Sequence, residues 1–215
     1  MELYPIMINL EGRRVCVIGA GEVALRKVKD LLGCGALVSV IAPLMHEGFA
    51  GLAEYYGDRL VMIKREYRYG DVGDSVLVFS ATNDERVNGT VFNEAQERNI
   101  LINAVDDPPN CSFFIPSSYR KGDLIMTLST SGASPAMAAR IRRELQKHIP
   151  EHIDIMLEAL KEAREMLKSD SRFVHLDSVR RGEVLKTMVN DDARLEELRL
   201  SFEQGSLGTF LLQIL

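Results

Sequence analysis

The sequence of 215 residues contains no uninterrupted apolar run long enough to span a membrane. Its first residues, MELYPIMINLEGRR, lack the basic start and long apolar stretch of a signal peptide. The cysteines Cys16, Cys34 and Cys111 are odd in number and show no CxxC spacing, which argues against a disulfide framework and a structural zinc site. We therefore expect a cytoplasmic chain that has no contact with a membrane.

Other signatures of function are also missing. The four histidines form no ligand constellation, and no GxSxG, P-loop or zinc-hydrolase motif occurs, so we expect no metal site. The net charge of -5 gives no support for nucleic-acid binding. Hydrophobic residues make up 46% of the chain and charged residues 27%, as is typical of a globular protein with a full core.

From residue 14 to residue 105 the pattern alternates between strand and helix, which is typical of a parallel sheet with crossover helices. Apolar residues at helical spacing predict helices over 22–32 and 84–98, the second capped by Asp84. The strands that we expect are Arg14–Ile18, Leu37–Ile41, Leu60–Ile63, Ser75–Ser80 and Ile100–Asn103.

The pattern changes after residue 106. We expect strands over 113–116 and 124–129, joined by a turn over 119–123, and then a helix that Ser134 caps and Pro135 opens. From residue 151 onward only helical spacing is visible, with breaks near 169–170 and 190–191. The predicted fold class is α/β: an N-terminal Rossmann-like parallel sheet, a central α/β region and a helical C-terminal domain.

A glycine turn, Gly19-x-Gly21-x-x-Ala24, follows the first strand and opens the first helix. Such a turn places a nucleotide pyrophosphate on the helix N-terminus, although a purely structural turn is the alternative. The acidic residue that usually holds the ribose about 20 residues on is missing, because the second strand ends in Ala42-Pro43-Leu44. The motif leaves NAD or NADP open, and the lack of an arginine after that strand favours NAD.

Two further strands end in polar residues. Thr82 follows the fourth strand, where it could line the cofactor cleft. Asp106 and Asp107 follow the fifth, and both could be turn formers before Pro108. We assign that role to Asp107 and interpret Asp106, nearest the strand end, as a general base beside the nicotinamide.

Small and basic residues mark the central region. The run from Ser129 to Ser134 could be a phosphate-type nest or a flexible linker, and its place between a strand and a capped helix favours an ordered loop. A basic patch follows on the helix, for which a solvated helix face is the simpler interpretation. Its members are Arg140, Arg142, Arg143 and Lys147.

Over most of residues 1–150 these motifs resemble the precorrin-2 dehydrogenase family, which also occurs as the N-terminal module of siroheme synthase and as the yeast-type dehydrogenase/ferrochelatase. The resemblance depends on five segments in order: Tyr4-Pro5-Ile6 with Leu10; Val17-Ile18-Gly19-Ala20-Gly21-Glu22-Val23-Ala24 with Arg26-Lys27; Ala81-Thr82-Asn83-Asp84; Asn103-Ala104-Val105-Asp106-Asp107 with Ser112-Phe113; and Ser131-Gly132-Ala133-Ser134-Pro135.

The resemblance implies NAD-dependent oxidation of precorrin-2 to sirohydrochlorin, in a homodimer built through residues 113–147. It places the essential aspartate on Asp106. It implies cofactor contacts at Glu22, Val23, Pro43 and Leu44, which add to those that the motifs indicate at Gly19, Gly21 and Thr82. Because the substrate is an anionic tetrapyrrole, we expect contacts to it at Arg120, Lys121, Thr130, Ser131, Arg140 and Arg142. Thr130 stands where some members carry serine.

We expect three domains: NAD-binding over 1–112, dimerisation over 113–149 and helical over 150–215. Two other functions stay open from the sequence. One is a bifunctional enzyme that also inserts iron, because the family's chelatases use no dedicated metal motif. The other is an NAD-sensing Rossmann regulator without turnover, although such a sensor would not need Asp106.

Overall fold

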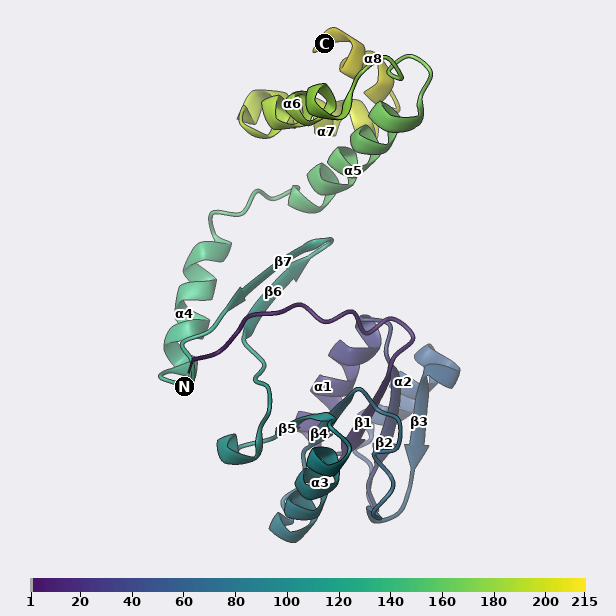
Figure 1. Ribbon diagram of the computed structural model, residues 1–215, viewed down its shortest axis with the longest axis vertical. Helices are drawn as coiled ribbons and strands as arrows, with labels where there is room; N and C mark the ends of the chain where they lie inside the picture. The colour runs from purple at the N-terminus through teal and green to yellow at the C-terminus, as the bar shows by residue number, and fades with distance from the viewer. Residues whose placement is uncertain (1) are drawn as a thin grey trace. The chain divides into compact units, whose positions relative to one another are not determined.

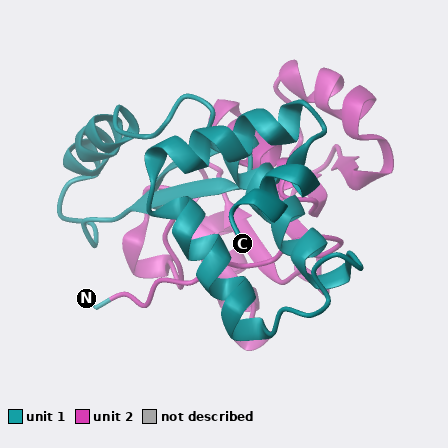
Figure 2. Cartoon of the chain, turned by 90° about the horizontal axis from the view of Figure 1, so that it is seen from above, with its two compact units in different colours: residues 1–2, 116–215 teal, residues 3–115 magenta. Residues whose placement is uncertain are grey.

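The computed structural model describes residues 2–215 (Figure 1). The chain divides into two compact units, one over Leu3–Ile115 and one over Pro116–Leu215 together with Glu2 (Figure 2). Among the residues described, no helix combines the length and the apolar character needed to cross a membrane.

A parallel sheet with helices on both faces forms the first unit, as predicted. Its strands lie in the order β3-β2-β1-β4-β5 and are β1 (Arg14–Ile18), β2 (Leu37–Ile41), β3 (Leu60–Ile63), β4 (Leu77–Ser80) and β5 (Leu101–Ala104). The helices are α1 (Glu22–Gly33), α2 (Gly48–Tyr56) and α3 (Glu85–Glu97), with 3-10 turns η1 (Gly57–Arg59) and η2 (Pro108–Asn110). The strand order reverses between β1 and β4, and ligands of such sheets bind at the carboxyl ends of the strands beside this point.

Both faces of the sheet are buried, which is why its strands read as continuous apolar runs. Val15 and Val17 of β1 belong to a cluster with residues of α1 and α2. Cys16 and Ile18, which point to the opposite face, belong to a second cluster with residues of α3. The carboxyl edge of the sheet is therefore held rigidly from both sides.

A loop over 64–76, not a helix, connects β3 with β4. The guanidinium of Arg65 donates two hydrogen bonds, of 2.6 and 2.7 Å, to the carboxylate of Asp71. Tyr67 donates to the carboxylate of Glu94, a residue of α3 that is fully buried. Glu94 also accepts from the backbone N–H of Gly70, at 2.9 Å. These bonds fasten the loop to α3.

The second unit begins with an antiparallel hairpin, β6 (Ser117–Lys121) and β7 (Leu124–Leu128), followed by α4 (Pro135–Gln146). Our prediction of a strand over 113–116 is wrong, and the predicted turn over 119–123 shrinks to the two residues 122 and 123. The reason lies in the first unit. The rings of Phe113 and Phe79 pack with their centres 5.4 Å apart, and the backbone carbonyl of Phe113 accepts from the Asn103 side chain at 3.0 Å. The backbone here bonds to a side chain of β5 and not to a neighbouring strand.

The remainder of the second unit is helical, as predicted. Its helices share a buried apolar cluster and are α5 (Ile153–Ser169), α6 (Ser178–Val189), α7 (Asp192–Glu203) and α8 (Leu207–Gln213). Asp177 caps α6 and Asp191 caps α7, each accepting a hydrogen bond from a first-turn backbone N–H. The division into three domains at 112 and 149 stays a prediction.

Candidate active site

The turn between β1 and α1 lies directly against the loop that follows β4. Gly19 has a φ of +99°, which favours glycine, and a β-carbon there would come within 2.2 Å of the carbonyl oxygen of Ala81. The protein's own backbone therefore requires glycine at position 19. This contact joins the carboxyl ends of β1 and β4 at the point where the strand order reverses.

Gly21 differs from Gly19 in a way that points to a ligand. Its φ of -77° and ψ of -172° suit any residue, and a β-carbon there would meet no protein atom within 4 Å. Gly21 is also the N-cap of α1, and no side chain caps the helix. The first backbone N–H groups of α1 are thus open to an anion, and the side chain that glycine lacks leaves room for it. These residues fit a dinucleotide pyrophosphate.

The end of β2 is fastened to the same turn. The backbone N–H of Gly19 donates to the carbonyl of Ile41 at 2.9 Å, and that of His46 donates to the carbonyl of Ala20 at 2.9 Å. Between these bonds lie Pro43 and Leu44, both predicted cofactor contacts, and Leu44 is 84% exposed. Glu22 and Val23, also predicted contacts, are exposed in the first turn of α1. The structure places all four around the glycine turn.

Thr82 follows β4 on the loop that touches Gly19. Its hydroxyl accepts from the backbone N–H of Asp84 at 2.8 Å, and Asp84 in turn caps α3 as predicted. Asn88 of α3 was not predicted as a site residue; it is buried, and its side-chain amide donates to the carbonyl of Thr82 at 3.1 Å. Its amide oxygen accepts from the hydroxyl of Ser80, at 2.7 Å. Asn88 thereby holds this loop in place; the only available signal was a polar residue beside the apolar stripe of α3.

Asp106 follows β5 at the same edge of the sheet. The backbone N–H of Val105 donates to the carbonyl of Ser80 at 2.8 Å, which fixes the strand end beside β4. Asp106 is exposed and has a φ of +60°, a left-handed conformation that aspartate and asparagine tolerate better than most residues. Within residues 2–215 no hydrogen bond or ion pair engages its carboxylate. That carboxylate can therefore accept a proton from a ligand.

Asp107 has the turn role that we assigned to it. Its carboxylate accepts from the side-chain amide of Asn110 at 2.6 Å, and its carbonyl accepts from the thiol of Cys111 at 3.4 Å. The same thiol donates to the carbonyl of Ala104 at 3.1 Å. Asp107 closes the turn after β5, whereas Asp106 makes none of these contacts.

The predicted anion contacts all lie in the second unit. Lys121 donates to the carbonyl of Glu151 and lies 3.8 Å from the carboxylate of Asp154, so it joins the hairpin to the start of α5. Arg142 donates to the hydroxyl of Ser117 at 3.0 Å and to the side chain of Gln146 at 3.2 Å. Both partners of Arg142 are neutral, so its charge remains available to an anion. Arg120 and Arg140 are exposed.

The small-residue run before α4 is an ordered turn and not a linker. The hydroxyl of Thr130 accepts from the backbone N–H of Ser134 at 3.0 Å, and its carbonyl accepts from that of Ala133 at 2.9 Å. Ser131 has a φ of +51°, and its N–H donates to the hydroxyl of Ser129 at 3.1 Å. Ser134 then caps α4 by accepting from Met137 at 3.2 Å.

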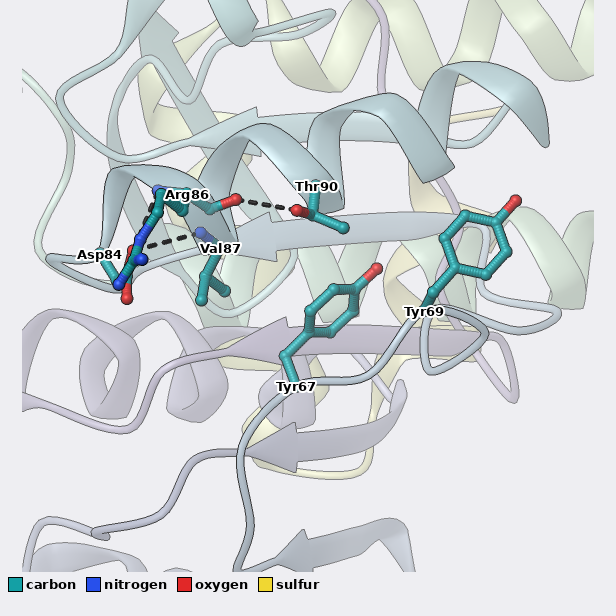
Figure 3. A pocket seen from close by; sticks show the side chains of 6 residues that line it. All are labelled: Tyr67, Tyr69, Asp84, Arg86, Val87 and Thr90. Carbon is teal, nitrogen blue, oxygen red and sulfur yellow. Dashed lines mark hydrogen bonds and ion pairs between the residues drawn. The ribbon is translucent and has the colours of Figure 1, made fainter.

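A shallow pocket of about 340 Å³ opens beside the start of α3. Figure 3 shows two tyrosines from the loop over 64–76 and four residues from the start of α3 around it: Tyr67, Tyr69, Asp84, Arg86, Val87 and Thr90. None of the predicted site residues lines this pocket. Residues 2–215 also hold no group of three or more histidine, cysteine, aspartate or glutamate side chains that could bind a metal ion.

Known proteins resemble this chain in both units. A family described as putative NAD(P)-binding matches residues 6–117, and one described as sirohaem biosynthesis protein central matches residues 121–148. The first match confirms the predicted class of cofactor, a nicotinamide dinucleotide. The second covers the hairpin turn, β7, the small-residue run and α4.

The chain is 34% identical over 221 residues to siroheme synthase 1 of Cronobacter sakazakii, covering 99% of this chain and 46% of the relative. It is 36% identical over 173 residues to the siroheme synthase of Photorhabdus laumondii, covering 78% of this chain and 35% of the relative. The chain thus spans less than half the length of these relatives. A solved structure described as SirC, precorrin-2 dehydrogenase, is 28% identical with a TM-score of 0.78, covering 99% of this chain and 98% of the other. The predicted resemblance is confirmed.

Proposed function

Because this chain belongs to the putative NAD(P)-binding family that matches residues 6–117, we propose that it is a dehydrogenase that uses NAD to oxidise precorrin-2 to sirohydrochlorin, on the route to siroheme. The observation that carries the proposal is that two features needed for the reaction lie at one edge of the parallel sheet. At that edge the uncovered N-terminus of α1 at Gly21 and the unpaired carboxylate of Asp106 follow strands of the same sheet. The similarity to the precorrin-2 dehydrogenase structure along 99% of this chain supports the choice of substrate.

The oxidation removes two hydrogens, one as hydride and one as a proton. NAD, when bound, accepts the hydride. Asp106 takes the proton, since its carboxylate has no partner within the described residues and its turn is fixed through the bond from Val105 to Ser80. Gly21 and the first N–H groups of α1 would hold the pyrophosphate of NAD, and Pro43, Leu44, Glu22, Val23 and Thr82 would contact the rest of the cofactor.

Precorrin-2 bears many carboxylates, and the second unit supplies cations and hydroxyls for them. We assign this binding role to Arg120, Lys121, Thr130, Ser131, Arg140 and Arg142. Arg142 is the best supported, because its two partners leave its charge uncompensated. Lys121 is the least supported, because it already contacts α5 and the carboxylate of Asp154.

We also propose that the protein is a homodimer built through the hairpin and α4. Met137, Ile141 and Leu145 recur one turn apart on α4 and are 46%, 38% and 45% exposed. Ala138 is the one residue of α4 that is buried. A hairpin with one helix and so little core needs a further apolar surface to be stable, and a second copy supplies it through the same stripe. The cytoplasmic location belongs to this proposal too, since the number and spacing of the cysteines suit a reducing compartment.

Replacing Asp106 by asparagine tests the catalytic role. Asparagine tolerates the left-handed backbone at this position, so the fold and NAD binding should survive. Turnover of precorrin-2, followed through NADH formation, should fall on the order of 10²–10⁴-fold, the usual cost of removing a general base.

Asp107→Asn is the matched control. Its side-chain oxygen can still accept from Asn110, so its turnover should stay near that of the wild type. Near-normal turnover in Asp106→Asn, or an equal loss in Asp107→Asn, would show that Asp106 is a turn residue only. A wild-type protein that forms no NADH from precorrin-2 would contradict the proposed function itself.

A further inference from the structure

We propose that Lys27 binds a carboxylate of the tetrapyrrole beside Asp106, and so helps to place the substrate for proton removal. This inference rests on the proposed function. It concerns a residue of the first unit, at the edge of the sheet that also carries the cofactor turn.

Lys27 lies on α1 and is partly buried. Its ammonium nitrogen stands 5.1 Å from the centre of the Phe79 ring on β4. Phe113 packs edge-on against the same ring at 5.4 Å and is held by the side chain of Asn103 on β5. The charge of Lys27 thus lies over an aromatic ring one residue before the end of β4, the strand that pairs with β5.

The charge of Lys27 is poorly compensated by the protein. Within residues 2–215 it forms no ion pair and no hydrogen bond, and its contact with Phe79 is a cation–π interaction. The charged groups that act on it are Arg26 and Asp30 on its own helix, and Asp106 after the end of β5. Burial, and after it the neighbouring Arg26, lowers the pKa of Lys27 below its ordinary value of 10.5.

Such an environment disfavours the ammonium ion in the ligand-free protein, because the ion loses water without gaining an anionic partner. A carboxylate of the substrate would supply that partner. The new ion pair would be partly desolvated, and so stronger than one formed at an exposed lysine. Phe79, below the ammonium, pairs with Asn103 of β5, and Asp106 comes three residues after Asn103, so a substrate held at Lys27 lies at the strand ends that carry the proposed base.

Lys27→Met removes the charge and keeps an unbranched apolar stem against Phe79. A hydrogen bond to a charged group contributes about 1.5–3 kcal/mol, so KM for precorrin-2 should rise about 10- to 100-fold. We expect kcat to change by no more than a few-fold and the Kd of NAD to stay the same. Lys27→Arg keeps the charge and should recover most of the lost affinity.

Lys29→Met is the matched control, since it removes the same charge from an exposed position of the same helix. Three results would overturn the role of Lys27. They are an unchanged KM in Lys27→Met, an equal rise of KM in Lys29→Met, and a Lys27→Met variant that loses affinity for NAD alone. Equilibrium titration with sirohydrochlorin, followed by absorbance, tests the inference without turnover: Lys27→Met should bind it about 10- to 100-fold more weakly. A wild type that binds sirohydrochlorin through Lys27 but does not oxidise precorrin-2 would defeat the proposed function alone, whereas equal binding by the two proteins would defeat the inference.

Discussion

The two glycines of the β1–α1 turn look alike in the sequence but differ in what requires them. At Gly19 a β-carbon would collide with the backbone of Ala81, and the φ of +99° is strained for any other residue. At Gly21 the backbone is ordinary and the space is open. One glycine therefore serves the fold, and the other leaves room for the cofactor.

This difference predicts opposite outcomes for two substitutions. Gly21→Val should leave the melting temperature nearly unchanged and abolish NAD binding, because the branched side chain fills the space of the pyrophosphate. Gly19→Ala should lower the free energy of unfolding by more than about 1–3 kcal/mol, the usual cost of a strained backbone, because the new β-carbon also collides with the backbone of Ala81. This loss should appear with and without NAD. Calorimetric NAD titration and thermal unfolding of both variants measure these effects. Wild-type NAD affinity in folded Gly21→Val would contradict the cofactor site.

The loop over 64–76 stands where a crossover helix is usual, and its buried polar bonds replace the packing that a helix would give. The side chain of Asp71 is 13% exposed and receives two hydrogen bonds from Arg65 and one from the backbone of Arg68. The hydrogen bonds from Arg65, the largest influence, lower the pKa of Asp71 below its ordinary value of 3.8. The ionised carboxylate is therefore bound more favourably in the folded chain than in the unfolded one.

The sign of this shift fixes a pH dependence. A carboxyl group whose pKa is lowered by folding stabilises the protein above the unfolded value, and the contribution is lost as the pH falls below it. Asp71→Asn should cost about 1–3 kcal/mol in the free energy of unfolding at pH 7, and the difference from the wild type should shrink below about pH 4. Urea unfolding of both proteins at a series of pH values measures this difference in the free energy of unfolding.

Asp74→Asn serves as the control for this element. Asp74 is 91% exposed and lies 3.7 Å from Arg14, so its replacement should have little effect at any pH. A constant difference for Asp71→Asn from pH 7 to pH 3 would show that the ion pair does not fasten the loop.

At the scale of the whole molecule, the apolar stripe of α4 predicts the oligomeric state. Ile141 lies in the middle of the stripe, and Ile141→Glu would place a charge in the proposed interface between two copies. In analytical ultracentrifugation the wild type should show twice the chain mass of 24.1 kDa, and the variant should show the chain mass itself. Lys161→Glu, at an exposed position of α5 outside the proposed interface, should remain dimeric. A wild-type monomer at micromolar concentration would contradict the proposed dimer.

The sequence by itself determined the features that depend on neighbours along the chain. The alternation of strands and helices predicted the parallel sheet. Strands buried on both faces are apolar throughout, and helices between them show apolar residues at helical spacing, so both kinds of element can be recognised in the sequence. The caps at Asp84 and Ser134 could also be predicted, because a side chain there bonds to a backbone N–H two or three residues away. The placement of the glycine turn and Asp106 at one edge of the sheet could be predicted too, because each follows a strand and parallel strands all end at the same edge.

Tertiary structure alone decided what depends on residues distant in the chain. The segment over 113–116 has the composition of a strand, yet the carbonyl of Phe113 accepts a hydrogen bond from the Asn103 side chain and its ring packs on Phe79. Asn88 holds the loop after β4 only because folding buries it beside Ser80. Lys27 looks like an ordinary helix lysine in the sequence, and only the folded sheet places its ammonium over Phe79, the partner of Asn103 in β5. Such side chains gain their roles from burial and from partners that the local pattern does not encode, because desolvation and long-range contacts exist only in the folded chain.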